Sequence, residues 1–483
     1  MNADREKAPS NVSEQTAPRS AASDQPSSAG SMPNRAASLD DASDQPSSAS
    51  SASNSSTVAS AAPNRTRPVL NRVIFALLTL VLGGLAGAFV WVFFFLLNHG
   101  INLFWHVLPE HIGAWWWPLA VCLVGGVAIG LFERRFGAYP EDLNKVMAQV
   151  KETGRYEYKH IGASAGGALL PLLFGGSVGP EAGLTGVIAG LCTWVGDRLK
   201  FLGKEFRELS QAGTAAVLSA VFNAPLFGLA APLLGSCDEV KAGTKIEVPK
   251  ATKIIVYTFA VAGAFGVMIL LGSVFGGGEG LPHFSEVSID WYERALIIPL
   301  ALAGGAVGLL YHAFDKCADT FAHKIGDHPV AKAVLVGLIL GSLGIVFPFV
   351  MFAGETQTET LMSTYTMLGA GYLILTGVLK VFTTPLCLRL GWRGGHFFPT
   401  IFAGICLGYG FALLTGADPV CCLCICSAAL MGAIMRQPIM TVLLLFLLFP
   451  IRAFAVMLVA ACIGAALTSL ALSLVKRVKR GRP

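Results

Sequence analysis

Long apolar runs begin near residue 69 and recur almost to the end of this 483-residue chain. The mean hydropathy is +0.62 and only 13% of the residues are charged, whereas about a quarter are charged in soluble domains. Runs of this length and composition are typical of helices that cross a lipid bilayer. The sequence therefore excludes an ordinary soluble domain and predicts an all-α polytopic membrane protein.

The charge pattern restricts the partners and the chemistry. The formal net charge is +5, and the basic residues lie at the edges of apolar runs, so nucleic acid is not expected as a partner. The sequence contains no HExxH, no Walker A segment and no His, Asp or Glu group at metal spacing within an apolar run. We therefore expect neither an enzyme nor a bound cofactor or metal.

Three regions follow from composition. Residues 1–68 are predicted to be a disordered Ser/Ala-rich cytoplasmic tail, because residues 1–60 hold 17 Ser and 12 Ala, with no aromatic residue or Ile. Residues 69–475 are predicted to form one membrane domain with two related halves, roughly 69–240 and 251–475. Residues 476–483 are predicted to be a basic cytoplasmic tail. Basic residues flank the first and last runs, so both termini are expected in the cytoplasm, with an even number of crossings.

The apolar runs differ in length. Some of them can span about 30 Å of hydrocarbon, such as 73–98, 251–274, 291–313 and 329–352. Six others are shorter and broken by Gly and Pro, namely 161–174, 180–196, 212–222, 225–235, 399–415 and 426–435. Such short segments predict half-helices that meet inside the protein.

A Gly-rich segment occurs twice, as GGSVGP at 175–180 and as GGHFFP at 394–399, each followed by an apolar run. An Ala-Ala pair then lies nine residues before Pro225 in the first half and nine residues before Pro438 in the second. Two features in the same order indicate an internal repeat. Paired, broken segments of this kind predict a transport site where the breaks converge.

Three prolines are predicted to mark helix starts, Pro140, Pro180 and Pro399, because proline is tolerated at the first helical position. The unpaired N–H groups there, and the positive end of the helix dipole, favour an anion. Several helix N-termini that point at one place can hold a small anion without a positively charged side chain. A full positive charge would bind the anion too tightly for conduction. Residues 140–150 also fit a short interfacial helix with one apolar face, and this alternative is favoured for Pro140.

Four segments resemble a known family: GGSVGP (175–180), FNAPLFG (222–228), KVFTTPLC (380–387) and GGHFFP (394–399). They are similar to the signature segments of the CLC chloride channels and chloride/proton antiporters, and the resemblance covers nearly all of the chain from about residue 70. It implies an inverted-repeat fold of tilted and re-entrant helices, and a homodimer in the cell membrane with one pathway per subunit. The implied substrate is chloride or a similar small anion. We do not expect the cytoplasmic nucleotide-binding modules that some members carry.

The gate position departs from that family. The family pattern GREGP has a central Glu that gates the pathway and carries protons, and the matching residue here is Val178. Glu181, just past Pro180, is either a displaced gate or a carboxylate that stabilises its helix N-terminus. The family's second proton-carrying Glu matches Gly235, with Asp238 and Glu239 close by.

The resemblance also proposes the anion site. The family serine of GSGIP matches Gly137, and the family tyrosine falls on Arg452, or on Phe454 if the alignment shifts. The full set of predicted anion-binding residues is Gly137, Ser177, Val178, Gly179, His396, Phe397, Phe398 and Arg452. For His396 the alternative, a packed neutral side chain, is favoured over one that titrates.

Basic residues surround the second Gly-rich segment. Lys380 and Arg393 are predicted to attract anions into the pathway, while Arg389 either does the same or reaches towards water. The cysteines at 421, 422, 424 and 426 are predicted to be buried apolar thiols rather than a metal site. Taken together, the residues predict passive transport of small inorganic anions such as chloride. The alternative is a chloride/proton antiporter that uses a displaced carboxylate such as Glu181.

Overall fold

The structure is a computed structural model that describes residues 66–153, 155–198, 206–222, 224–234, 250–276, 282–284, 286–446 and 448–480. The residues from Asn64 onward form one compact unit. Most of the predicted N-terminal tail lies outside the described residues, and so do Asn223, Gly235, Asp238 and Glu239.

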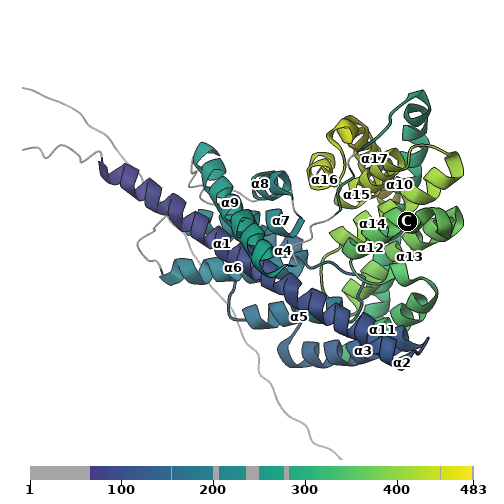
Figure 1. The fold of residues 1–483 in the computed structure, drawn as a ribbon, viewed down its shortest axis with the longest axis horizontal. Helices are drawn as coiled ribbons and strands as arrows, with labels where there is room; N and C mark the ends of the chain where they lie inside the picture. Colours follow the sequence, from purple (N-terminus) through teal and green to yellow (C-terminus); the bar gives the residue numbers. More distant parts are fainter. Residues whose placement is uncertain are drawn as a thin grey trace, which may run out of the picture. The chain divides into compact units, whose positions relative to one another are not determined.

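Helices make up nearly all of the described chain (Figure 1). The first half contains α1 (Thr66–Asn102), a π-helix (Leu103–Val107), α2 (Leu108–Ile112), α3 (Trp117–Phe136), α4 (Leu143–Thr153), α5 (Ile161–Leu173), α6 (Glu181–Arg198), α7 (Phe206–Phe222) and α8 (Pro225–Leu234). The second half contains α9 (Lys250–Phe275), α10 (Trp291–Ile325), α11 (Pro329–Val346), the 3-10 helix η3 (Pro348–Val350), α12 (Glu355–Leu368), α13 (Ala370–Arg389), α14 (Phe397–Thr415), α15 (Pro419–Met435), α16 (Pro438–Leu445), the 3-10 helix η4 (Ile451–Ala453) and α17 (Phe454–Arg480).

Seven described helices are long and apolar enough to cross a membrane: α1, α9, α10, α11, α13, α14 and α17. The shorter apolar helices α5, α6, α7 and α15 confirm the prediction of broken segments in both halves. The run 399–415 was wrongly placed among the short pieces, because α14 starts at Phe397 and reaches 19 residues. Its proline fits within the first turn, where no N–H partner is lost.

Three other predicted boundaries differ from the structure. The run 329–352 does not form one span, because α11 ends at Val346 and η3 follows from Pro348. Both predicted tail boundaries, at 68 and at 476, fall inside helices, since α1 begins at Thr66 and α17 continues to Arg480. Lys and Arg are good helix formers, so a change to basic composition does not by itself end a helix.

Close backbone contacts hold the helices together. Helix α1 lies along α9, and α3 from the first half packs on α11 from the second half (Figure 1). A Cβ added at Gly87 would lie 2.3 Å from the Ala264 carbonyl oxygen, so α1 and α9 touch through their backbones. Small residues allow this approach, which is how helices associate where lipid supplies no hydrophobic driving force.

Helix termini are fixed by local side chains. Asp290 caps α10 in a capping box, in which its backbone N–H donates to the Glu293 side chain over 3.0 Å. Asp418 accepts from the Cys421 N–H over 2.7 Å and caps α15. Each cap satisfies N–H groups that a helix leaves unpaired, worth about 1 kcal/mol per cap.

Candidate anion site

The two Gly-rich segments meet directly. Gly179 and Gly395 form an isolated antiparallel bridge, in which each N–H donates to the other's carbonyl over 2.8 and 2.7 Å. These residues belong to different halves of the chain and precede α6 and α14. The two Gly-rich segments therefore converge, as predicted, and the N-termini of α6 and α14 come together there.

Glu181 joins the two halves at this point. It is the first residue of α6, it is buried, and its Oε1 accepts from the Phe397 N–H over 2.8 Å. Its Oε2 is buried and accepts no hydrogen bond from the residues that the structure describes. The carboxylate therefore lies at the positive N-terminus of α14, which is where an anion is favoured.

Glycine is required beside this carboxylate. A Cβ added at Gly395 would lie 1.8 Å from the Glu181 Cδ, and one added at Gly179 would lie 2.0 Å from its Oε2. Any side chain at either position would occupy the space of the carboxylate. The Gly-rich segments thus allow the backbone to approach this carboxylate closely.

Val178 and Ser177 lie next to the bridge. Val178 is completely buried, and a Cβ added at Gly394 would lie 2.7 Å from the Val178 Cβ. The Ser177 hydroxyl is 3.1 Å from the Thr384 hydroxyl of α13, so it already has a partner. An apolar side chain thus packs directly beside the bridge, and its match to the family's gating Glu stays a prediction.

Aromatic rings cover one side of the bridge. The Phe222 ring stacks on Phe398 with centroids 4.8 Å apart, and the Phe227 ring meets Phe397 edge-on at 6.3 Å. His396 caps this side, with its ring 4.5 Å from that of Phe397. Ser177, Val178, Gly179 and residues 396–398 therefore lie around one point, while their role in anion binding stays a prediction.

The segment of Gly137 lies against the first-half helices. The Tyr139 carbonyl oxygen is 2.4 Å from the Cβ position of Gly167 on α5, and the Pro140 Cγ is 3.6 Å from that of Gly183 on α6. Pro140 does not start a helix, because α4 begins at Leu143. Asp142 is the residue whose carbonyl accepts the first helical N–H groups of α4.

The apolar face expected for α4 is present, since Leu143, Val146 and Val150 are buried. Gly137 itself is exposed. Its assignment to the anion site stays a prediction.

Lys380 is completely buried on α13 and binds backbone carbonyls. Its Nζ donates to the carbonyl oxygens of Met351 and Phe352 over 2.7 and 2.6 Å, and to those of Phe349 and Val350 over 3.4 and 3.2 Å. It also lies 5.1 Å from the centre of the Phe402 ring. This cation holds the chain between α11 and α12 in place, and its predicted attraction of anions stays untested.

Replacing Lys380 with Met should therefore destabilise the protein. Four carbonyl oxygens would lose the Lys380 donor, and among the described residues only that of Met351 keeps a second one, the Gln357 Nε2 at 3.0 Å. Each buried polar group left unpaired costs about 1 to 3 kcal/mol. We expect a loss of at least about 3 kcal/mol, measured as a lower midpoint of thermal unfolding in detergent. Lys316→Met, at an exposed position on α10, is the matched control. Unchanged stability, with conductance lost mainly at low salt, would favour anion steering instead.

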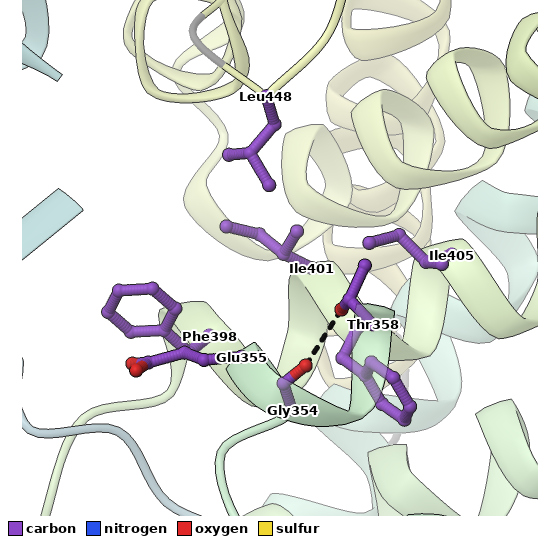
Figure 2. Close-up of a pocket in the computed structure, with 8 residues that line it drawn as sticks. Gly354, Glu355, Thr358, Phe398, Ile401, Ile405 and Leu448 are labelled. Carbon is purple, nitrogen blue, oxygen red and sulfur yellow. Dashed lines mark hydrogen bonds between the residues drawn. The ribbon is translucent and has the colours of Figure 1, made fainter. Parts of the chain in front are cut away.

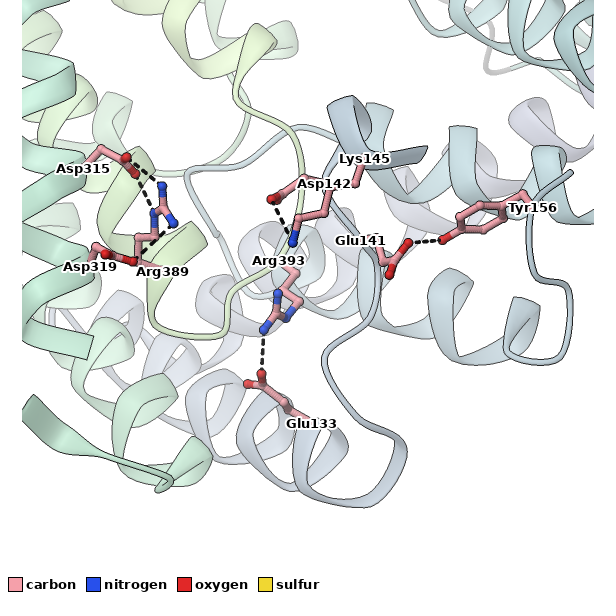
Figure 3. Close-up of polar contacts among 9 residues, drawn as sticks. All are labelled: Glu133, Glu141, Asp142, Lys145, Tyr156, Asp315, Asp319, Arg389 and Arg393. Carbon is pink, nitrogen blue, oxygen red and sulfur yellow. Dashed lines mark hydrogen bonds and ion pairs between the residues drawn. The ribbon is translucent and has the colours of Figure 1, made fainter. Parts of the chain in front are cut away.

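The two arginines near the second Gly-rich segment form ion pairs (Figure 3). Arg389 binds Asp315 through two bonds of 2.7 Å and lies 3.3 Å from Asp319. Arg393 binds Glu133 at the end of α3 over 2.9 Å, while its buried Nε has no partner among the described residues. Arg393 thus ties the segment before α14 to the first half, and its action on anions stays a prediction.

Arg452 and Phe454 lie at the start of the last helix. Arg452 is exposed on η4, and Phe454 begins α17 with 41% of its surface exposed. Both differ in this from the buried Val178 and Phe397. Neither assignment to the family tyrosine position is tested by the structure.

The cysteines at 421, 422, 424 and 426 are buried free thiols on α15, as predicted. Among the described residues, no group of three His, Cys, Asp or Glu side chains could hold a metal ion.

Comparison with known sequences shows which family the chain belongs to. The sequence model of the family described as voltage gated chloride channel matches residues 125–470. The chain belongs to this family. It is therefore a multi-pass membrane protein of the CLC anion-transport family, whose members are channels and transporters rather than enzymes.

Two relatives show how far this CLC chain has diverged. It is 26% identical over 327 residues to the ion-transport protein named YfeO of Escherichia coli, which covers 64% of this chain and 71% of the relative. It is 28% identical over 354 residues to a chloride channel protein named ClcB-like of Ralstonia nicotianae, which covers 69% and 77%.

Solved structures show the same fold. A slow cyanobacterial Cl⁻/H⁺ antiporter matches with a TM-score of 0.66 at 16% identity, covering 84% of this chain and 98% of that one. A CLC-type fluoride/proton antiporter matches with a TM-score of 0.65 at 18% identity, covering 82% and 95%. The predicted CLC fold is thereby confirmed.

Two residues near the predicted site were not among those predicted from the sequence. Thr384, the partner of Ser177, has no sequence signal beyond its place in the segment KVFTTPLC. Glu355, the first residue of α12, was not considered, although a carboxylate that follows a long apolar run and a glycine is a visible signal. Both lie near the bridge only because helices from distant parts of the chain pack together.

Proposed function

We propose that this CLC protein carries chloride passively across the membrane, through a pathway that passes the N-terminus of α14. The proposal rests on the hydrogen bond that the Glu181 carboxylate accepts from the Phe397 N–H. A group with a negative charge already occupies this buried place, and a chloride ion offers the same charge to the same donor. Partial charges of this kind bind an anion weakly enough to release it.

Glu181 acts as the gate of this pathway. While ionised, it holds the Phe397 N–H and excludes chloride from it. Once protonated, it no longer competes as an anion, because the positive end of α14 favours negative charge. The gate has thus moved from the family position, now Val178, to a residue three positions further along.

The transport is proposed to be uncoupled from protons. Val178 cannot carry a proton, and Gly235 matches the family's second carboxylate position. The second candidate is chloride/proton exchange, which is favoured by one observation, the buried carboxylate of Glu181 at the meeting point of the two halves. We also propose a homodimer with one pathway per subunit and both termini in the cytoplasm.

Reconstituted liposomes test this function. Under a chloride gradient, we expect chloride efflux that becomes faster as the pH falls, with no accompanying proton uptake. The measurement records chloride with an electrode and protons with a trapped pH dye, and the reversal potential is determined under separate chloride and pH gradients. Proton movement against its gradient, in fixed ratio to chloride, would replace the uncoupled proposal with exchange. Absence of chloride flux would refute both.

A further inference from the structure

A second carboxylate, Glu355, lies on α12, which packs against the helix α14 whose first N–H holds the proposed gate. Glu355 is the first residue of α12, and its side chain lines a small cavity (Figure 2). The lining residues are Gly354, Glu355, Thr358, Phe398, Ile401, Phe402, Ile405 and Leu448. Figure 2 shows the side chains of Glu355 and Phe398 together on one side of this cavity.

Glu355 and Glu181 converge on consecutive residues of α14. Glu181 binds the Phe397 N–H, and Glu355 shares the cavity with the side chain of Phe398. Each carboxylate has one oxygen that is buried and without a hydrogen-bond partner among the described residues. A buried, unpaired oxygen is costly when it carries charge, so two such groups near each other cannot both be ionised cheaply.

We propose that Glu355 is a positioning residue of the gate, which forms a carboxylate pair with Glu181 and sets the pH at which Glu181 takes up its proton. The inference rests on the proposed function, in which Glu181 is the gate. The negative charge of Glu355 repels that of Glu181 and favours the protonated, open gate. The two groups then titrate as a pair, with the charge of one deciding the proton affinity of the other.

Burial and neighbouring charge both act on this pair. Burial and the nearby charge of Glu181 raise the pKa of Glu355, whose helix is not one of the seven candidate spans. His396, just before α14, has its ring 4.5 Å from that of Phe397 and 6.2 Å from that of Tyr311 on α10, while the Nζ of Lys380 is occupied by carbonyls. Helices α5 and α8 and residues 211–222 of α7 carry no ionisable side chain.

Glu355→Gln tests the pair. Removing the neighbouring charge lowers the proton affinity of Glu181, so more acid is needed to open the gate. We expect the midpoint of acid-activated chloride efflux from liposomes to move down by about half a pH unit or more. Glu359→Gln is the matched control, because this residue is exposed one turn further along the same helix. A midpoint equal to that of wild type would overturn the inference.

Two further variants separate charge from structure. Glu355→Asp keeps the carboxylate and should keep the midpoint closer to that of wild type than Glu355→Gln does. The double variant Glu181→Gln/Glu355→Gln should show the same flat pH profile as Glu181→Gln, because Glu355 acts through Glu181. If the flux of Glu181→Gln still depends on pH, Glu181 is not the gate. If that variant has a flat pH profile but Glu355→Gln keeps the wild-type midpoint, Glu181 remains the gate and only its coupling to Glu355 is refuted. Thermal unfolding of each variant in detergent identifies any that fails to fold.

Discussion

Glu181→Gln is expected to make chloride flux fast at neutral pH and insensitive to acid. The amide is close in shape to the carboxylate but carries no charge, so it competes weakly with chloride for the Phe397 N–H. If the ionised gate is closed in about nine of ten molecules at pH 7.5, its loss raises the flux about tenfold there, since one pKa unit is a tenfold population change. Chloride efflux from liposomes between pH 4.5 and 8, about the range over which carboxyl groups can be shifted, measures both effects.

The control for this variant is Glu152→Gln, an exposed position on α4 that should leave the pH profile unchanged. If Glu181 only stabilises helix N-termini, Glu181→Gln should lower the unfolding midpoint while the flux keeps its wild-type pH dependence. That result would contradict the proposal that Glu181 is the gate.

Gly395→Ala should damage the site more than any other small substitution. The three atoms nearest to the new Cβ all belong to Glu181, at 1.8 to 2.4 Å, so the carboxyl group and the Cβ cannot occupy their places together. Either the bridge to Gly179 opens or Glu181 leaves the Phe397 N–H. We expect a stability loss of about 3 kcal/mol, the upper end for overpacking, measured as thermal unfolding in detergent, and loss of acid activation in the folded fraction.

A second substitution tests the cause of that damage. Gly395→Ala/Glu181→Ala removes the three atoms nearest to the new methyl group, so the double variant should be more stable than Gly395→Ala alone. Gly371→Ala is the matched control, since a Cβ there has open space around it. Equal stability of the single and double variants would show that Glu181 does not occupy the position described.

The local sequence determined the class of fold and the pieces of the site. Apolar runs, glycines and prolines act within a few residues, so they predicted long helices, broken helices and the two Gly-rich segments that meet at Gly179 and Gly395. Helix ends were less well predicted, as for α14 and α17, because favourable residues on either side of a run extend a helix. The family segments, taken with these, were enough to predict the CLC fold.

Only the tertiary structure decided which groups touch. The sequence left Glu181 between a gate and a stabiliser of its own helix, whereas the structure places it on an N–H that is 216 residues away, at the start of α14. It likewise gave Lys380 four carbonyl partners and brought Glu355 to the same end of that helix. Such partners depend on how helices from both halves pack, which no local spacing of residues encodes. Burial then sets the free-energy cost of each charged group, because a carboxylate or an ammonium group that is shielded from water needs a hydrogen-bond partner within the protein.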